Sequence, residues 1–460
     1  MNKTTLYLII TTALSLLLVI GMGIYILIGF GSESEQEYIP TGTYNPENPE
    51  TPVNTIDGAF VEVLPPTYTN MGWWSEGLLA VANQVEGAGL ERWGFVDATG
   101  ELVIPLQWMY VSAFSEGLAA VWVNDKWGFI DTDGNTVIQP RYEQVEAFSQ
   151  GRAAVMRNGL WGFIDTQGNE IVPPRYMTVR SFSNGLAAVA QHNATATWPF
   201  ERWGFISLDG NVAVPLRYDF VNCFSEGYAA VFNGRRTSYP VGFNGVWHVI
   251  NTAGEYVLAD LPYGRIWRFH EGAAATRRDV DGVLLIGFME PDGNWVIEPQ
   301  FDRGGGSEGY NFQNGVSVQR HGNEEFALVS RSGEILIPLG EDTISDFVDG
   351  YAVFGVPDLR CHCGRHALQD GPYWGIINTR GEVTVPRTLT HEELRIIPGG
   401  LVLTLDGCAE VGYTMGVLTV DGTLVNVQPF AVNGLGTPNA DGIIPFMRDG
   451  IWGLVTIDAE

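Results

Sequence analysis

The amino-acid sequence predicts an all-β repeat domain, folded as a β-propeller-like ring of short antiparallel blades. Three observations predict this fold class. A phrase that begins Phe-Ser-x-Gly-x-Ala-Ala-Val, continues Trp-Gly-Phe-Ile-Asp and ends near Pro-Arg-Tyr recurs along the chain, most clearly at residues 114–142, 148–176 and 182–218. No stretch of these copies has the length or the period of a helix. The two ends of the chain carry complementary parts of one further copy.

Each copy contains four expected strands, which we name A to D. In the copy that begins at residue 114 they are Leu118–Val123 (A), Trp127–Asp131 (B), Thr136–Ile138 (C) and Tyr142–Phe148 (D). These runs are short, rich in β-branched and aromatic residues, and separated by Asn, Asp and Gly, which is typical of hairpins. Because one such unit cannot bury its own apolar face, it must pack against its neighbours.

The copies continue almost to the end of the chain. Their strand B tryptophans are 34 residues apart from Trp93 to Trp127 and again from Trp127 to Trp161. Later copies keep the order of strands while their residues diverge. The expected aromatic positions at which copies begin are Trp74, Phe114, Phe148, Phe182, Phe224, Phe269, Phe312 and Phe347, with Ile397 in a weaker copy.

The two chain ends fit the two halves of one unit. Residues 61–68 and the following Trp73-Trp74 fit strands C and D, whereas residues 441–446 and 451–454 fit strands A and B. We therefore expect residues 56–460 to form one WG-type β-repeat domain of about ten units, the last completed by residues 56–74. A ring sealed in this way has no exposed sheet edge. The alternative is an open β-solenoid whose end halves act as caps.

These residues resemble the WG, or KWG, β-repeat family of bacterial proteins. Lys126-Trp127-Gly128 matches the signature tripeptide, and the other copies keep Trp-Gly or part of it. The resemblance covers roughly residues 56–457. It implies a binding or scaffold protein and no particular activity, because a fold alone does not define a function.

The N-terminus predicts a membrane anchor. Residues 6–30 carry no charge and are rich in Leu and Ile, and at about 1.5 Å per helical residue they can cross a hydrocarbon core of about 30 Å. Lys3 precedes this transmembrane signal anchor, so the positive-inside bias places residues 1–5 in the cytoplasm and the repeats outside. Residues 31–55 are expected to form a flexible linker. We therefore expect a single-pass protein of the bacterial cytoplasmic membrane with an extracytoplasmic β domain.

The chain is strongly acidic, with 53 acidic and 25 basic residues and a net charge of −28. Nucleic-acid binding depends on cations placed at phosphates, so this balance argues against it. It also argues against a surface that lies on anionic lipid. It favours solubility through repulsion between like charges, or a surface that binds cations or basic proteins.

Most residues that look chemical belong to the repeat itself. Asp97, Asp131 and Asp165 follow strand B and precede a glycine by three positions, so they are expected to cap turns rather than bind calcium. The strand B tryptophans share one position in the repeat. They are therefore expected to pack in the core or between units rather than stack on sugars.

The variable part of the repeat is the connection between strands A and B, the A–B loop. It spans 6 positions in the tight copies, but 14, 16 and 21 positions in the copies whose strand B begins at Trp203, Trp247 and Trp374. Insertions in one connection of a repeat emerge on one face, the usual place for binding. Aromatic residues beside arginines suit protein or carbohydrate contacts. The candidate ligand-binding residues are Trp198, Phe200, Arg202, Arg235, Arg236, Tyr239 and Phe243.

The longest A–B loop contains Cys361, Cys363 and His366, and Cys408 lies in the A–B loop of the next copy. Outside the cytoplasm, a disulfide between the two loops is one expectation. Thiols and imidazoles also suit zinc, so a structural zinc site built from these four residues is a second, and free thiols are a third. Cys223 is expected to be a small buried hydrophobic residue.

No catalytic constellation stands out. The histidines are scattered over loops and degenerate positions, and there is no phosphate-binding glycine loop or His-Glu-x-x-His pair. The leading expectation is a membrane-anchored binding or scaffold protein, without a cofactor, that presents a rim of A–B loops to a protein or a cell-envelope polysaccharide. The alternative is a hydrolase or metal-dependent enzyme with its site in the ring channel or at the Cys/His loop.

Overall fold

The computed structural model describes residues 55–459 with a few exceptions. These exceptions are residues 86–88, 193–200, 239–240, 263, 302, 305–310, 322–324, 341–342, 356–373, 390–392 and 409–411. In the part described, every regular element is a β-strand, and no helix long and apolar enough to cross a membrane is found there. The expected cytoplasmic stub at 1–5, the anchor at 6–30 and nearly all of the linker at 31–55 lie outside the described residues.

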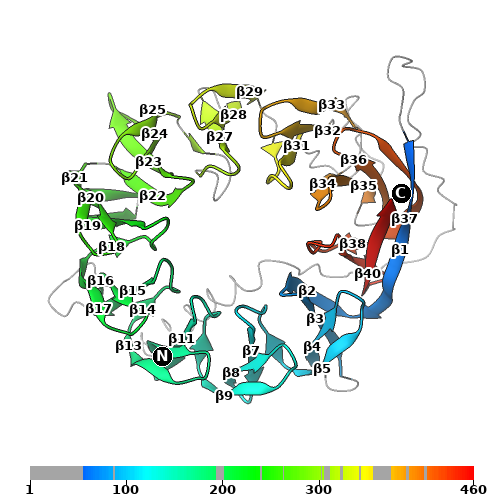
Figure 1. Ribbon diagram of the computed structural model, residues 1–460, viewed down its shortest axis with the longest axis horizontal. Coiled ribbons are helices and arrows are strands. Elements are labelled where there is room, and N and C mark those ends of the chain that lie inside the picture. Colours follow the sequence, from blue (N-terminus) through cyan, green and yellow to red (C-terminus); the bar gives the residue numbers. More distant parts are fainter. Residues whose placement is uncertain are drawn as a thin grey trace, which may run out of the picture. The chain divides into compact units, whose positions relative to one another are not determined.

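The strands form a ring of ten four-stranded blades around a central opening (Figure 1). Within each blade the strands run antiparallel and follow one another outward. Blades 1 to 3 are β2 (Asn70–Ser75), β3 (Leu78–Gln84), β4 (Glu91–Asp97) and β5 (Leu102–Trp108); β6 (Tyr110–Val111), β7 (Leu118–Val123), β8 (Lys126–Asp131) and β9 (Thr136–Tyr142); and β10 (Gln144–Val145), β11 (Arg152–Arg157), β12 (Leu160–Asp165) and β13 (Glu170–Tyr176).

The next four blades continue the same pattern. They are β14 (Thr178–Val179), β15 (Leu186–His192), β16 (Glu201–Ser207) and β17 (Val212–Tyr218); β18 (Phe220–Val221), β19 (Tyr228–Ser238), β20 (Val241–Asn251) and β21 (Tyr256–Leu261); β22 (Arg265–His270), β23 (Ala273–Val280), β24 (Val283–Met289) and β25 (Trp295–Phe301); and β26 (Arg303–Gly304), β27 (Val316–His321), β28 (Glu325–Ser330) and β29 (Ile335–Gly340).

The last three blades complete the ring. They are β30 (Thr343–Ile344), β31 (Tyr351–Gly355), β32 (Trp374–Asn378) and β33 (Val383–Leu389); β34 (Glu393–Ile397), β35 (Leu401–Cys408), β36 (Gly412–Thr419) and β37 (Leu424–Val432); and β38 (Gly434–Leu435), β39 (Ile444–Arg448), β40 (Ile451–Ala459) and β1 (Thr55–Tyr68).

Strand β1 closes the ring. It pairs antiparallel with β40, from Gly58 opposite Ala459 to Tyr68 opposite Trp452. Its first residues also pair in parallel with β37 of blade 9, with Thr55 opposite Leu424. The first described strand thus joins blades 9 and 10, which removes the free edge that an open stack would leave. The expected ring is confirmed, and the solenoid alternative is wrong.

One boundary differs from the sequence prediction. Strand D does not pair with the strands of its own copy. It forms the innermost strand of the next blade, as where β10 pairs with β11. Each blade is therefore built in the order D, A, B, C from the opening outward. The closing blade consequently takes three strands from the C-terminal end and one from the N-terminal end, instead of two from each, because β2 belongs to blade 1.

Aromatic contacts between neighbouring blades explain why two phenylalanines recur in each copy. Phe129 on β8 of blade 2 meets Phe148 of blade 3 edge-to-face, with ring centroids 4.9 Å apart. The same contact joins Phe95 to Phe114 at 4.8 Å. Both rings of each pair are almost fully buried. The core is therefore divided into layers that lie between blades, and each layer needs one ring from each side.

The outer strand of each blade explains the glycine of Trp-Gly. Opposite Gly128 the register shifts by a bulge in β9, and a Cβ on Gly128 would lie 2.4 Å from the Ile138 carbonyl oxygen and 2.6 Å from the Pro140 nitrogen. Only glycine leaves room for this backbone crossing. Pro140 also lacks an N–H group, and proline in an outer strand discourages pairing with another chain.

Candidate functional site

The ring has two unlike faces, because successive connections in an antiparallel blade alternate between its ends. The loop face carries the A–B connections and the links between blades. The turn face carries the turns between the innermost and second strands and those between the third and outer strands. The sequence prediction placed ligand binding on the loop face. The chemistry of both faces bears on that prediction.

On the turn face, the repeated Ser-Glu-Gly turn ties neighbouring blades together. Glu76, in a left-handed conformation with φ of 49°, accepts a hydrogen bond from the backbone N–H of Gly117 in the next blade at 2.9 Å. The Glu116 carboxylate accepts two, from Gln150 and Gly151. The tie continues from Glu226 to Gly272, from Glu271 to Gly315 and from Asp349 to Gly399. The repeated acids of this turn are therefore structural groups.

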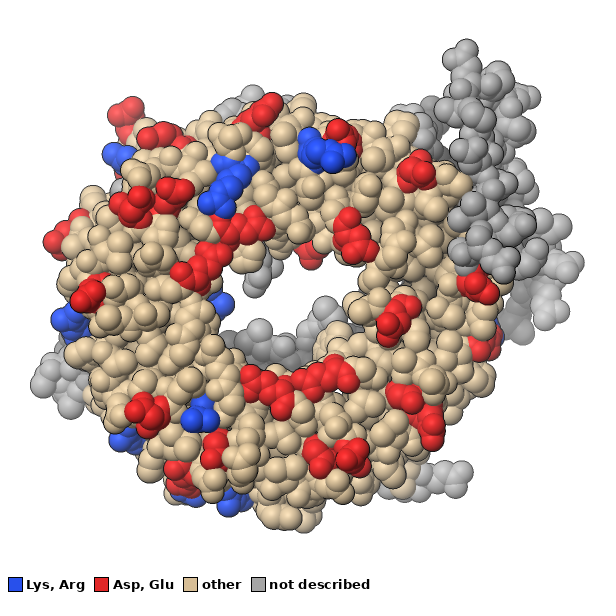
Figure 2. Space-filling view, in the orientation of Figure 1, with Lys and Arg blue, Asp and Glu red and all other residues tan. Residues whose placement is uncertain are grey.

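Acidic side chains line much of the rim of the central opening in the face shown in Figure 2. The Ser-Glu-Gly turns end the innermost strands, so such a rim is expected of them. Serine adds a second tie beside the acid. The Ser115 hydroxyl donates to the Phe148 carbonyl oxygen at 2.8 Å, and Ser149 donates to Phe182 in the same way.

The acids of the outer turns cap those turns, as predicted. Asp131 Oδ1 accepts hydrogen bonds from the backbone N–H groups of Asp133 and Asn135 at 3.1 and 2.8 Å. Asp97 and Asp165 accept corresponding bonds. Partial burial raises the pKa of the Asp165 carboxyl, but hydrogen bonds from Asn169 and Gln167 outweigh it, so the pKa lies below its ordinary value.

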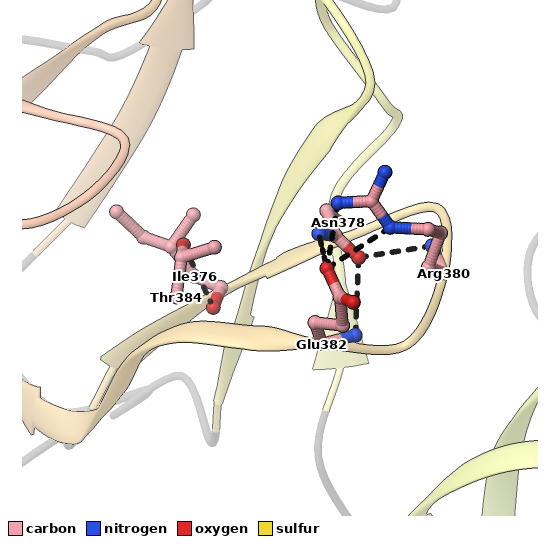
Figure 3. Close-up of polar contacts among 5 residues, drawn as sticks. All are labelled: Ile376, Asn378, Arg380, Glu382 and Thr384. Atoms are coloured by element: carbon pink, nitrogen blue, oxygen red, sulfur yellow. Dashed lines mark hydrogen bonds and ion pairs between the residues drawn. The ribbon is translucent and has the colours of Figure 1, made fainter.

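Blade 8 replaces the capping aspartate with asparagine and adds an ion pair (Figure 3). Asn378 Oδ1 accepts from the N–H groups of Arg380 and Glu382 at 2.9 and 3.0 Å, and its Nδ2 donates to Glu382 Oε2 at 2.7 Å. Arg380 donates to the same carboxylate oxygen from Nε and Nη2. Hydrogen bonds from Arg380 and then Asn378 lower the pKa of Glu382. The turn's charges are thus engaged locally.

On the loop face, the longest described A–B connection is a hairpin rather than a loop. Strands β19 and β20 of blade 5 continue to pair beyond the blade core, through Arg235 opposite Asn244 and Arg236 opposite Phe243, to Ser238 opposite Val241. The two strands have 11 residues each, against 6 in β11 and β12 of blade 3. The predicted binding residues Arg235, Arg236 and Phe243 therefore lie on paired strands that extend beyond the blade.

The neighbouring blade 4 contributes Arg202 to this face. Its guanidinium pairs with the Asp219 carboxylate, whose other oxygen accepts a hydrogen bond from the Gly234 N–H at 2.8 Å. Arg202 thereby anchors the base of the blade 5 hairpin, so its charge is already partnered. The other three predicted binding residues, Trp198, Phe200 and Tyr239, lie outside the described residues.

The predicted cysteine and histidine site lies mostly outside the description as well, because residues 356–373 include Cys361, Cys363 and His366. Cys408 ends β35 of blade 9, opposite Gly412. Among the residues that the structure describes, no group of three or more His, Cys, Asp or Glu could hold a metal. Disulfide, zinc and free thiols all remain predictions for these loops.

Cys223 differs from its prediction. The thiol is free and only half-buried, and its Sγ lies 3.7 Å from Arg268 Nη2 of the next blade. It occupies the position before the recurring aromatic, which Ala113 and Ala147 fill in other blades, and both of those residues are exposed. The position faces away from the layered core. The innermost strand is too short for an alternation of buried and exposed residues to show this in the sequence.

The strand B tryptophans pack between blades as predicted. Trp203 and Trp247 are buried, and the others described are half-buried.

Two surface features were not predicted from the sequence. Trp73 on the innermost strand β2 is 66% exposed, and its signal was the Trp-Trp doublet, where the next two copies have Ala113 and Ala147 before the aromatic. In blade 6, Arg265, Trp267 and Arg277 cluster where the repeat loses its usual residues.

These features define a class of protein, a closed β-propeller-like repeat ring. Hydrogen bonds join neighbouring blades on its turn face, and the length of the A–B connection varies on its loop face. Its repeats are WG-containing repeats, since the model of that family matches residues 93–127, 127–161, 161–193, 203–235 and 286–318. The chain therefore contains WG repeats, as its Trp-Gly pairs predicted.

Several solved structures match the chain at low sequence identity. A eukaryotic initiation factor is 11% identical, with a TM-score of 0.43 over 80% of this chain and 96% of that one. BamB from Moraxella catarrhalis is 10% identical, with a TM-score of 0.30 over 86% and 98%. The computationally designed protein Ika8 is 12% identical, with a TM-score of 0.31 over 75% and 94%. No curated protein matches the sequence significantly.

Proposed function

We propose that this chain is a membrane-anchored, extracytoplasmic binding or scaffold protein that presents its A–B hairpins to a protein or a cell-envelope polysaccharide. The observation that carries the proposal is the contrast between the two faces. On the turn face, acids of blades 1, 2, 5 and 6 accept hydrogen bonds from the next blade that hold the ring. On the loop face, the same connection is tight in blade 3 and projects as a long hairpin in blade 5.

Variation confined to one connection is typical of a binding face, because a rigid scaffold tolerates insertions there without losing its core. A paired hairpin is also better preorganised than a loose loop, so less conformational entropy is lost on binding. The membrane attachment rests on the uncharged residues 6–30 and on Lys3 before them.

Trimming the blade 5 hairpin tests the binding proposal. Residues 234–245 are replaced by Asn-Gly, the two-residue turn that already joins β11 to β12 in blade 3, so Asn233 and Val246 stay paired. In pull-downs from the native envelope, the trimmed protein should lose partners that the full chain retains. The control R380Q/E382Q removes an ion pair from the turn face at unchanged net charge, and should retain them. Identical partners for all three proteins would refute the proposal.

The location is tested by protease treatment of intact and permeabilised cells. Protease that reaches the outer side of the cytoplasmic membrane should cleave the β domain without access to the cytoplasm. The chain should also remain in the membrane fraction after a high-salt wash. Deletion of residues 6–30 should release it from that fraction. A full chain that is already soluble, or a β domain accessible only from the cytoplasm, would refute the anchoring.

A further inference from the structure

Proline in the outer strands protects the rim of the ring from pairing with other chains. Eight blades are separate four-stranded sheets, and the outer strand of each is a free edge, which offers N–H and C=O groups to another strand. Proline interrupts such pairing because it lacks an N–H group. It occurs in seven of these eight strands, as Pro105, Pro140, Pro173, Pro174, Pro215, Pro299, Pro338 and Pro386. The exception is β21 of blade 5, which contains no proline.

Strand β21 is also exposed and suited to pairing. Tyr256 and Val257 at its start are 45% and 37% exposed. Aromatic and β-branched residues are common in strands, and the only charged residue in β21 is Asp260. The strand lies on the outer circumference of the ring, where it forms the edge of its sheet (Figure 1).

The outer-strand bulge, which turns an edge away from a partner, is smaller in blade 5. In blade 2, residues 139–141 lie between two paired positions of β9. In blade 5, only Ala259 and Asp260 lie between the corresponding positions of β21. His248 replaces the glycine of Trp-Gly in this blade, and its Nδ1 accepts a hydrogen bond from the Asp260 N–H at 3.1 Å. Of the two features that protect β9, one is therefore absent from β21 and the other is reduced.

We propose that β21 pairs antiparallel with β21 of a second copy of this chain and thereby forms a reversible dimer. In a register centred on Leu258, Val257 lies opposite Ala259, so apolar residues meet. Asp260 then lies opposite Tyr256, so like charges do not meet across the pair. One sequence thus suits both sides of the contact.

A single proline-free edge in each ring makes the contact self-limiting. Two copies related by a twofold axis occupy both of these edges, and the prolines of the other outer strands oppose growth into a filament. One pair of six-residue strands is smaller than the interface of a permanent dimer, and each copy has a net charge of −28. The dimer should therefore dissociate on dilution and become stronger as salt screens the charge. This inference goes beyond the proposed function, because it concerns the outer circumference and not the A–B hairpins.

Sedimentation velocity of the full chain in detergent micelles tests the dimer. The parent chain should change from monomer to dimer as its concentration rises about a hundredfold. Ala259→Pro should remain monomeric over the same range, because it adds the missing proline to the edge. The fold should accept this substitution, since Pro338 of blade 7 occupies the equivalent position in a bulge of the same length.

A matched control adds proline to a strand that is already protected. Gln139→Pro changes the corresponding position of β9, beside the native Pro140, and reproduces the Pro173-Pro174 pair of β13. This variant should dimerise as the parent chain does, and both variants should melt within a few degrees of it. Loss of the dimer in both variants would show that proline acts through the fold and not through the edge of β21, and would overturn the inference.

Amide hydrogen exchange locates the contact without any substitution. Exchange in residues 255–262 of the parent chain should slow as its concentration rises, whereas the outer strands of the other blades should not change. A parent chain that stays monomeric throughout would overturn the inference. Protection that appears only elsewhere, or an A259P variant that dimerises normally, would do the same. Because the exchange measurement uses the parent chain, it decides the question even if A259P does not fold.

Discussion

The glycine of each Trp-Gly pair has no space for a side chain, although its backbone conformation would allow one. In blade 3 a Cβ on Gly162 would lie 2.3 Å from the Val172 carbonyl oxygen, and the same contact recurs at Gly94 and Gly128. The obstacle is backbone and cannot rotate away. The repeat signature is therefore a requirement of the outer-strand bulge and needs no ligand to explain it.

Gly128→Ala should destabilise the protein substantially. Overpacking a filled site costs about 1–3 kcal/mol, and a clash against backbone lies at the upper end of that range. The control Gly264→Ala places its Cβ 3.4 Å from Arg277 Cδ, an ordinary contact, and should change the free energy of unfolding by less than about 0.5 kcal/mol. Urea titrations of both variants provide the comparison. Equal effects of the two substitutions would contradict the steric argument.

Tyr218 should make the protein sensitive to alkali. Burial, and next a hydrogen bond with Tyr256, raise the pKa of Tyr218 to about 12. In the unfolded chain the phenol ionises near pH 10. Because the folded state holds the neutral form, this contribution to stability is complete below about pH 10 and is lost as the pH rises from about 10 toward 12.

Tyr218→Phe removes that ionisation, so its melting temperature should fall less than that of the parent chain between pH 9 and pH 11. The variant loses the hydrogen bond that Arg217 Nη2 donates to the Tyr218 hydroxyl at 2.9 Å and the 3.4 Å contact to Tyr256, so it is expected to start from a lower value at pH 8. Parallel pH profiles for the two proteins, measured by calorimetry, would show that Tyr218 is not responsible.

At the scale of elements, the Ser-Glu-Gly turn acts as a clip between blades. Some copies have an amide in place of the glutamate of this turn. In blade 3 it is Gln150, whose amide oxygen accepts a hydrogen bond from the Gly185 N–H at 2.8 Å. Blade 4 carries Asn184 in the same role toward Gly227. A charge is thus not required for the clip, but an oxygen acceptor is.

Glu116→Ala should therefore lose both bonds to blade 3 and cost about 1 kcal/mol, as the side chain is exposed and water competes for the freed N–H groups. Glu116→Gln should cost clearly less, because it restores the arrangement native to blade 3. The denaturation midpoints of the two variants give the order. A glutamine variant as unstable as the alanine variant would point to the charge instead.

Sequence patterns predicted the closed ring because the aromatic and glycine positions that pack between blades are the ones that repeat. They failed where pairing partners are distant. A two-residue strand such as β10 has no period, so nothing in it tells whether it pairs with its own copy or the next. The polar residues from Asn233 to Ser238 suggested a loop, although they form a hairpin. Arg265 and Arg277 become neighbours only through strand register, which needs the structure.

At the scale of the whole molecule, closure depends on one strand. Leu64 of β1 lies beneath the Gly100 turn of blade 1, while Tyr68 and Leu454 belong to the same buried cluster as Leu79. Removing β1 would expose the edge of β40 and one side of blade 9 together. A chain that begins at residue 69 should thus lose cooperative unfolding and associate through the free edge.

A circular permutant tests whether the position of β1 in the sequence matters or only its presence in blade 10. Ala459 lies opposite Gly58 in the antiparallel pair, so a two-residue Asn-Gly turn can join residue 459 to residue 58. The permutant begins at Thr69 and ends, after this turn, with Gly58–Tyr68. Blade 10 then becomes a continuous four-stranded hairpin series.

This permutant should share the oligomeric state of the matching fragment 55–460 and melt within a few degrees of it, because every antiparallel pair of blade 10 is retained. Only the three parallel pairs to β37 are lost. The truncation lacking β1 provides the control and should elute as aggregates in size-exclusion chromatography. If the permutant aggregates as well, the short parallel segment at Thr55–Asp57, rather than the antiparallel pairing with β40, holds the ring closed.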